Sequence, residues 1–134
     1  MNIQVNYSFE LTVNSPMYYR DCQIPKCYYE ALEIIVNQNG SYVIWSVGKF
    51  DTYGYIYKYS FDPLKPSDNL FFEHNGSCSQ GQFKFIIDLE MNTRYILVAT
   101  TYHPYTTGSF SIFISGSSNV SVNRFSKYFR LFCR

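Results

Sequence analysis

The stretch Phe50-Asp51-Thr52-Tyr53-Gly54-Tyr55-Ile56-Tyr57-Lys58-Tyr59 decides the fold class of this chain. Its four tyrosines recur at every second position, which is the spacing of side chains on one face of a β-strand. Aromatic and β-branched residues suit a pleated, half-buried surface, and Gly54 relieves crowding or marks a bulge. Turn residues flank the stretch at 48–49 and 61–66, which limits it to one strand. We expect it to be a central strand of a β-sandwich.

Composition narrows the class of protein. The 134 residues suffice for one domain with a core, and 20% are aromatic while only 16% are charged. That balance excludes a disordered chain, and the net charge of +1 lacks the basic excess expected of a nucleic-acid-binding protein. No apolar run approaches the roughly 18 residues of a membrane span, and no signal-peptide pattern is recognisable. We therefore expect a mature or trimmed form with no nucleic-acid partner and no membrane span.

The N-terminal residues alternate most regularly. Six apolar side chains are separated by single polar ones, at Ile3, Val5, Tyr7, Phe9, Leu11 and Val13. This pattern predicts a strand with one apolar face. Residues 29–36 and 41–47 flank an Asn-Gly turn at 37–40, a strong signal that the two runs pair as a hairpin.

Further strand patterns follow along the chain. Residues 95–101 are almost continuously apolar, as in a strand buried on both faces, and shorter patterns cover 70–73, 83–89 and 110–114. Short strands separated by regular turns predict an all-β fold, an antiparallel β-sandwich or jelly roll of about eight or nine strands. We divide the chain into an N-terminal strand (1–15), a β-sandwich domain (16–118) and a C-terminal strap (119–134).

The even number of cysteines predicts disulfides. Cys22, Cys27, Cys78 and Cys133 lack zinc-finger spacing, and four cysteines allow three pairings. We favour Cys27 with Cys78 and Cys22 with Cys133, because bridges that close long loops stabilise more than a local Cys22–Cys27 bridge. Buried thiols are the alternative.

Four Asn-x-Ser triplets match the acceptor pattern for N-linked glycans, at Asn6, Asn39, Asn75 and Asn119. Asn39 and Asn75 are favoured because they lie in glycine-containing turns. Together with the cysteines, these triplets predict a secreted, extracellular glycoprotein. The alternative is that the triplets arise by chance in a chain rich in Asn and Ser.

The span from Tyr28 to Gly116 resembles the bacterial pre-peptidase C-terminal domain and its expanded relatives in rotifer extracellular proteins. The similar pieces are Tyr28-Tyr29-Glu30-Ala31, Gly40-Ser41-Tyr42, residues 51–57, Phe61-Asp62-Pro63, Gly81-Gln82-Phe83, Tyr95-Ile96-Leu97-Val98, Thr100-Thr101-Tyr102 and residues 108–112. The resemblance implies a non-catalytic β-sandwich accessory module of secreted and surface proteins. Some members hold calcium after the central strands, where this chain has one carboxylate, Glu73.

Catalytic patterns are weak in this sequence. His74 or His103 could join Asp51, Asp62 or Asp68 in a serine-type triad, but no Gly-x-Ser-x-Gly elbow is present. We predict no enzyme activity, no catalytic residues, no cofactor and no metal site. The tyrosine row at 53–59 is read as core or a cross-strand ladder, with a sugar-stacking platform as the alternative. The basic and aromatic tail at 123–134 is read as a terminal strap rather than a membrane-binding helix.

The expected function is that of an extracellular structural or adhesive module, with a carbohydrate-binding module as the alternative. An apolar strand with unpaired backbone cannot stay exposed, so residues 3–13 must join a sheet in their own sandwich or in a neighbour's. Donation to a neighbour is head-to-tail and would build an open filament. We therefore hypothesise a homo-oligomer or filament in which Ile3, Val5, Tyr7, Phe9, Leu11 and Val13 are the subunit contacts.

Overall fold

A computed structural model of the chain describes residues 3–20, 26–74 and 81–125. These residues form ten strands: β1 (Ile3–Leu11), β2 (Met17–Tyr18), β3 (Cys27–Val36), β4 (Gly40–Gly48), β5 (Thr52–Lys58), β6 (Leu70–His74), β7 (Lys84–Leu89), β8 (Tyr95–Thr101), β9 (Gly108–Gly116) and β10 (Val120–Arg124). Within the three described ranges there is no helix of the length and apolarity needed to cross a membrane. The fold is therefore all-β, as predicted.

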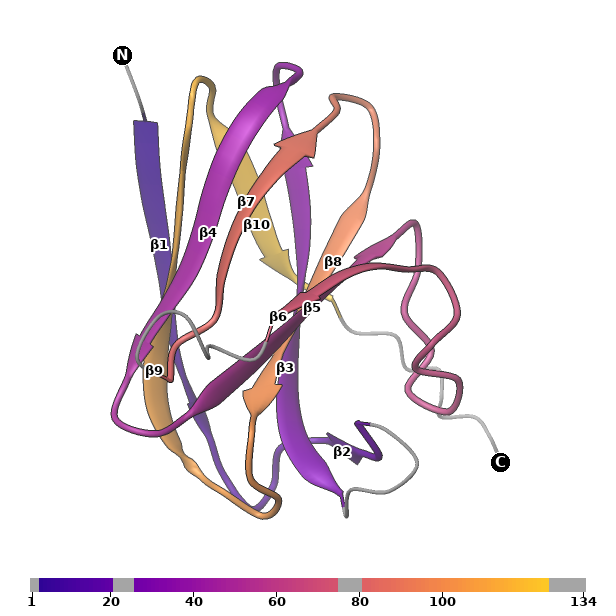
Figure 1. Cartoon of the computed structure of the whole chain (residues 1–134), viewed down its shortest axis with the longest axis vertical. Helices are drawn as coiled ribbons and strands as arrows, with labels where there is room; N and C mark the ends of the chain where they lie inside the picture. The colour runs from indigo at the N-terminus through magenta and orange to yellow at the C-terminus, as the bar shows by residue number, and fades with distance from the viewer. Residues whose placement is uncertain (1–2, 21–25, 75–80, 126–134) are drawn as a thin grey trace.

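The strands form two sheets that pack face to face (Figure 1). One sheet has the order β1-β9-β4-β7, and the other has the order β10-β3-β8-β5-β6 with β2 paired to β3. Every pairing is antiparallel. This confirms the two antiparallel sheets. The strand count exceeds the expected eight or nine because β2 and β10 both add short pairings to β3.

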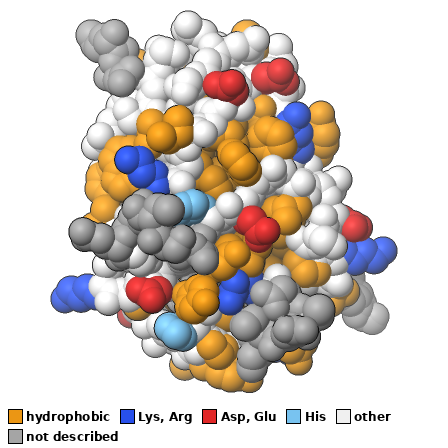
Figure 2. Space-filling view, in the orientation of Figure 1, with side chains coloured by type: hydrophobic (Ala, Val, Ile, Leu, Met, Phe, Trp, Pro, Cys, Tyr) orange, Lys and Arg blue, Asp and Glu red, His pale blue; other side chains and the backbone are white. Residues whose placement is uncertain are grey.

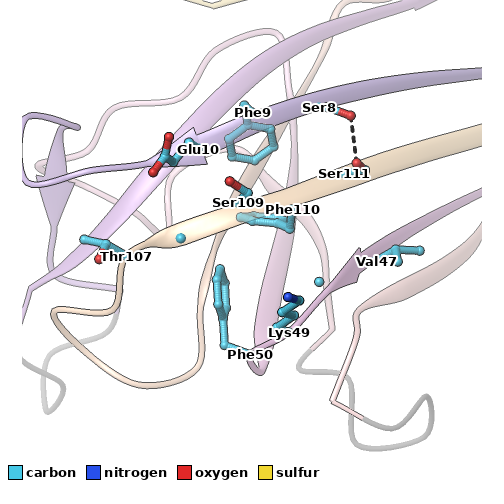
Figure 3. Close-up of a pocket in the computed structure, with 12 residues that line it drawn as sticks. Ser8, Phe9, Glu10, Val47, Lys49, Phe50, Thr107, Ser109, Phe110 and Ser111 are labelled. Carbon is cyan, nitrogen blue, oxygen red and sulfur yellow. Dashed lines mark hydrogen bonds between the residues drawn. The ribbon is translucent and has the colours of Figure 1, made fainter.

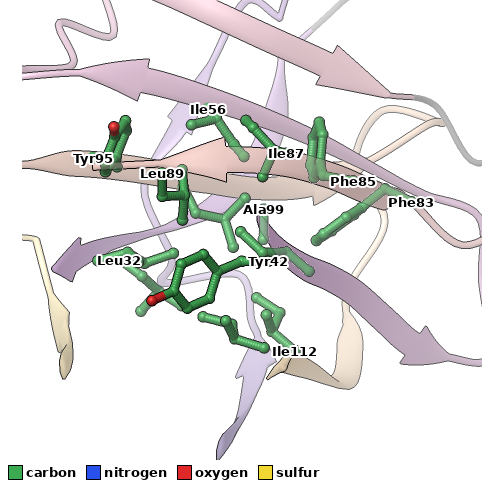
Figure 4. Packing of buried hydrophobic residues seen from close by; sticks show 14 of the residues in the cluster. Leu32, Tyr42, Ile56, Phe83, Phe85, Ile87, Leu89, Tyr95, Ala99 and Ile112 are labelled. Atoms are coloured by element: carbon green, nitrogen blue, oxygen red, sulfur yellow. The ribbon is translucent and has the colours of Figure 1, made fainter. Parts of the chain in front are cut away.

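The main core lies between the two sheets (Figure 4). It is built by alternate side chains of strands from both layers, including Leu32, Tyr42, Ile56, Phe85 and Leu97, each at most 3% exposed. On β7 the alternation is complete, with Phe85, Ile87 and Leu89 buried between exposed neighbours. Period-two patterning therefore sets which face of each strand is inside.

A second core covers the opposite face of the six-stranded sheet. It contains Tyr18, Tyr55, Tyr57 and Phe61, and Ile96 and Val98 of β8 support it from below. All seven residues of β8 are buried, because this strand has a core on each side. The prediction of a doubly buried strand at 95–101 is thus confirmed.

The tyrosine-rich strand β5 is not central. It lies between β8 and the edge strand β6, while β8 takes the middle of the sheet. Gly54 does relieve crowding, since a Cβ there would lie 2.8 Å from the Phe83 ring and 2.9 Å from Phe85. The strand ends at Lys58, so Tyr59 leaves the row with φ of 74° and is 60% exposed.

The predicted hairpin between residues 29–36 and 41–47 is wrong. β3 pairs with β8, β10 and β2, whereas β4 pairs with β7 and β9 in the other sheet. The Asn37–Gly40 segment therefore crosses from one layer to the other. The reason is packing: Ile34 and Val36 of β3 and Tyr42 and Ile44 of β4 belong to the same core from opposite sides.

Candidate functional site

The N-terminal strand lies at the edge of the four-stranded sheet of its own chain. β1 pairs with β9 along its whole length, from Ile3 opposite Gly116 to Leu11 opposite Gly108. Its apolar residues face the core, and Leu11 is fully buried. Val13 departs from the prediction: it is 75% exposed, because the chain turns where the Ser15 amide donates to the Thr12 carbonyl over 3.0 Å.

A buried carboxylate joins β1 to the other sheet. The Tyr7 hydroxyl donates to Glu30 Oε2 at 3.1 Å, and Arg124 Nε donates to the same oxygen at 3.0 Å. We call these three residues the β1 latch. Burial, followed by the Glu30 carboxylate, raises the pKa of Tyr7, and the same carboxylate raises the pKa of Arg124. The sequence signal for the latch was Glu30 in a largely apolar run that also holds Glu33, and sequence reasoning missed its role.

The tyrosine row belongs to the second core. Tyr53 and Tyr55 stack with centroids 4.8 Å apart, and Tyr55 and Tyr57 are at most 3% exposed. The Arg20 guanidinium lies 4.3 Å above the Tyr53 ring and donates to the Tyr55 hydroxyl at 3.3 Å. Burial raises the pKa of Tyr55 and of Tyr57 far above the ordinary value of tyrosine. The interpretation as core is therefore the right one, since Tyr55 and Tyr57 offer no open ring face for a sugar.

A half-buried aromatic pair lies on the four-stranded sheet. We call the side of this sheet that points away from the core the outer face. Its side chains are Gln4, Asn6, Ser8 and Glu10 of β1, Ser109, Ser111, Phe113 and Ser115 of β9, Ser41, Val43, Trp45 and Val47 of β4, and Lys84, Ile86 and Asp88 of β7. Trp45 and Phe113 are cross-strand neighbours and stack with centroids 5.4 Å apart and an interplanar angle of 14°.

The outer face is divided by chemistry. β4 contributes mostly apolar side chains and β7 contributes Ile86 between the charged Lys84 and Asp88, whereas β1 and β9 contribute mostly amides and hydroxyls. Val47 is 51% and Ile86 68% exposed. The polar groups on the β1 side of the aromatic pair are thus uncharged, whereas on the other side Trp45 lies opposite the charged Lys84 of β7. The apolar side chains of β4 beside the neutral polar groups of β9 make this face a candidate binding surface.

An open groove adjoins one end of the outer face (Figure 3). It holds about 910 Å³ and is lined by Ser8, Phe9, Glu10, Val47, Gly48, Lys49, Phe50, Thr107, Gly108, Ser109, Phe110 and Ser111. Phe110 forms its floor, with Phe9 at 4.4 Å and Phe50 at 5.5 Å between ring centroids. Gly108 has φ of 144° and its missing Cβ makes room for the Phe50 ring. The groove thus combines aromatic walls with a rim of hydroxyls, one lysine and one glutamate.

The predicted disulfide residues are only partly described. Cys27 is fully buried, and its Sγ lies 3.8 Å from the His103 carbonyl oxygen. Cys22, Cys78 and Cys133 lie outside the described residues, so the disulfide staples stay a prediction. The C-terminal strap begins as β10, paired with β3, and its residues 126–134 also lie outside the described ranges.

The described glycan acceptors are accessible. Asn6, Asn39 and Asn119 are exposed, and Asn75 lies outside the described residues. Asn39 Oδ1 accepts a hydrogen bond from the Met91 amide at 2.8 Å. The described acceptor asparagines therefore lie in two settings: Asn6 in the middle of a strand on the outer face, and Asn39 and Asn119 between strands.

The two histidines have separate surroundings. His103 Nε2 lies 4.0 Å from Asp51 Oδ2, with both side chains more than half exposed, while His74 Nδ1 accepts the Lys84 amide at 3.1 Å. Glu73 accepts a hydrogen bond from Tyr53 at 3.5 Å. Among the described residues, no three His, Cys, Asp or Glu side chains gather as a metal site.

Comparison of the chain with protein-family models, with curated proteins and with solved structures gave no match. The resemblance to the pre-peptidase C-terminal domain therefore stays a prediction. The face of the molecule seen in Figure 2 carries hydrophobic and uncharged polar side chains, with few and scattered charges. The surface features to explain are thus the edge strand β1, the outer face and the groove.

Proposed function

We propose that this protein is a non-catalytic, extracellular structural or adhesive module whose subunits join by exchange of β1. The observation that carries the proposal is the position of β1: it is the first strand of the chain and an edge strand, and its backbone pairs only with β9. A short segment, Thr12–Pro16, connects it to the rest of the fold. When such a strand docks on β9 of a neighbour, every contact seen within one chain is kept.

The energetics support this exchange. The strand offers apolar side chains to the core, the β1 latch and a nine-residue ladder, so a donated strand would be held as firmly as an internal one. Exchange costs mainly the freedom lost on association, and a head-to-tail arrangement leaves one donor strand and one acceptor sheet at the two ends. Disulfides and glycans, as predicted above, suit such a module to an extracellular matrix.

Cysteine trapping tests which chain supplies β1. Ser8 and Ser111 are exposed cross-strand neighbours whose Oγ atoms lie 2.7 Å apart (Figure 3). One batch of protein carries Ser8→Cys and a second carries Ser111→Cys, and the two are mixed, incubated under gentle denaturation, refolded and oxidised. Exchange predicts a disulfide between the two variants, identified by peptide mapping.

A matched pair within one sheet provides the control. Ser41 and Asp88 are cross-strand neighbours of β4 and β7, so the double variant Ser41→Cys, Asp88→Cys should form its bridge within one chain. If the doubly substituted Ser8→Cys, Ser111→Cys protein likewise yields only monomers, at concentrations where the wild type is assembled, β1 acts within its own chain and the exchange proposal fails.

A carbohydrate-binding module is the second candidate, and the groove favours it. Phe50 and Phe9 beside the hydroxyls of Ser109 and Thr107 offer apolar contact and hydrogen bonds in one cleft, which are the two interactions a neutral sugar needs. Calorimetric titration with neutral oligosaccharides should show binding that Phe50→Ala abolishes and that Phe71→Ala, an exposed aromatic outside the groove, leaves intact. Absence of heat with all sugars tested would remove this candidate.

A further inference from the structure

We propose that the outer face is covered by an N-linked glycan that the chain itself carries on Asn6. The inference rests on the extracellular setting of the proposed function and goes beyond it, because it assigns a role to the aromatic pair Trp45 and Phe113. The bond-forming step belongs to the secretory pathway. The Asn6 side-chain nitrogen bonds to C1 of a lipid-pyrophosphate-linked sugar, the C1–oxygen bond breaks, and the pyrophosphate leaves as the amide gives up a proton.

The register places the acceptor beside the aromatic pair. Asn6 of β1 lies opposite Phe113 of β9, and Phe113 lies opposite Trp45 of β4. All three point to the outer face, and directly opposed side chains have Cβ atoms about 4.5–5.5 Å apart. Since β9 lies between β1 and β4, the side of Phe113 turned away from Trp45 is the side toward Asn6. A sugar on Asn6 is therefore delivered against this ring.

The chemistry of the neighbouring positions suits a neutral glycan. Rows adjacent to Asn6 carry Gln4 with Ser115 and Ser8 with Ser111, which are amides and hydroxyls that can exchange hydrogen bonds with sugar hydroxyls. The apolar ring face of a pyranose covers Phe113, while Val47 and Ile86 extend the apolar area further from the attachment point. The row of Asn6 itself continues through Phe113 and Trp45 to Lys84 of β7, so its charged member lies beyond the aromatic pair from the attachment point.

The accessible acceptor Asn39 lies too far from the aromatic pair to place its first sugars there. Asn39 precedes Trp45 by six residues of nearly extended chain, which is roughly 20 Å along the strand. Its side chain is also held over the turn by the hydrogen bond from the Met91 amide. A glycan on Asn39 is therefore a matched control, because it adds sugar mass without lying across the aromatic pair.

The single tryptophan makes the test direct. Trp45 is the only tryptophan, so its fluorescence reports on this face alone. The protein is secreted from a eukaryotic cell line as the wild type, as Asn6→Gln and as Asn39→Gln, and glycopeptide masses give the occupancy of each site. We expect Asn6→Gln to raise acrylamide quenching of Trp45, to shift its emission to the red and to lower Tm by roughly 2–8 °C. Asn39→Gln should leave Trp45 quenching unchanged.

A second variant tests whether the Asn6 glycan acts by packing on Phe113 or merely by being attached to the chain. In a Phe113→Ser background the glycan remains attached, but removal of the Asn6 glycan should no longer change Tm. Asn39 occupied with Asn6 bare would overturn the inference and leave the extracellular assignment standing, whereas no occupied site at all would overturn both. Unchanged Trp45 quenching in Asn6→Gln overturns it as well, as does dimerisation through this face in the fully glycosylated protein.

Discussion

At the scale of single residues, glycines and aromatic rings fit together in pairs. Gly116 of β9 lies opposite Tyr42 of β4, and a Cβ at this glycine would overlap the Tyr42 ring. Tyr42 is fully buried, its hydroxyl donates to the Gln38 carbonyl at 2.8 Å and lies 2.6 Å from Ser118 Oγ. An aromatic ring that packs over a glycine in this way shields the glycine backbone, which has no side chain of its own to cover it.

Gly116→Ala should therefore destabilise the protein by about 3 kcal/mol, because neither the ring nor the backbone can move without breaking contacts on the other side. Gly40→Ala is the control, since its Cβ would meet the Ser117 hydroxyl at 3.1 Å and would lie at an ordinary contact distance of 3.9 Å from the Tyr42 ring. Urea unfolding of both variants measures the difference. Equal losses of stability in the two variants would show that the Tyr42 ring moves aside at little energetic cost.

Tyr18 presents the opposite situation, a buried polar atom with nothing to bond. Its side chain is 3% exposed, and its hydroxyl has no hydrogen-bond partner within the described part of the chain. Tyr18→Phe should leave stability unchanged or raise it by about 1 kcal/mol, since an unsatisfied buried group is removed. Tyr57→Phe should instead cost about 1 kcal/mol, because the Tyr57 hydroxyl donates to the Pro66 carbonyl at 2.7 Å. Thermal melts compare the two, and a loss in Tyr18→Phe as large as in Tyr57→Phe would contradict the assignment.

At the scale of elements, β1 is held by a few side-chain contacts beyond its ladder. The β1 latch connects β1 to the second sheet. β10 pairs with residues 32–36 of β3 and stops short of Glu30, whose carboxylate accepts the hydrogen bond from Tyr7 of β1. A hydrogen bond to a charged and largely buried carboxylate is worth more than one at the surface. The latch therefore fixes the position of β1 relative to both layers.

Tyr7→Phe should lower the free energy of unfolding by about 1–2 kcal/mol and increase the rate at which the backbone amides of β1 exchange their hydrogens with solvent. Ser8→Ala, on the same strand, removes an exposed hydrogen bond and should change stability by less than about 0.5 kcal/mol. Both variants are best made in unglycosylated protein, with hydrogen exchange of β1 amides as the readout. Comparable protection in the two variants would mean that the ladder alone retains the strand.

Sequence patterns predicted which segments are strands better than which strands are neighbours. Residues 3–11 were predicted as a strand because their apolar side chains alternate with polar ones, and residues 95–101 because their apolar side chains are nearly continuous. Both patterns follow from which side chains are buried. The pairing of β3 with β4 was mispredicted because a turn signal is local, whereas the choice of sheet depends on packing across the core. The outer face could not be predicted from the sequence. Tyr42 and Ile44 alternate with Val43 and Trp45, so both faces of β4 are apolar and the pattern does not indicate which one points away from the core.

At the scale of the whole molecule, the six-stranded sheet separates two cores, and the second is rich in tyrosine. Burial raises the pKa of Tyr18, Tyr55 and Tyr57, with the other tyrosines of the cluster adding to the effect at Tyr18. A folded pKa above the unfolded value means that the neutral phenol contributes stability below pH about 10, and that this contribution is lost as pH rises toward the folded pKa. The fold is therefore sensitive to alkali.

Stability should be flat from neutral pH to about pH 9.5 and should fall steeply above pH about 10. Buried phenols should ionise together with unfolding, so tyrosinate absorbance and loss of strand circular dichroism should share one midpoint. Tyr18→Phe should move that midpoint to higher pH. Ionisation of all tyrosines before any loss of structure would show that the second core is open to solvent.

The pairing of β1 with β9 also has a consequence in time. Ser8 and Ser111 are neighbours in space but 103 positions apart in the chain. During synthesis the first strand is complete long before its partner emerges, and for that interval its apolar side and backbone groups have no place in a sheet. A finished monomer nearby cannot help, because its own β9 is occupied, and the proposed filament offers an open acceptor sheet only at one end. Two unfinished copies on one messenger, however, can both be at this stage at once, so the proposed exchange of β1 would select its partner among the nascent chains of neighbouring ribosomes.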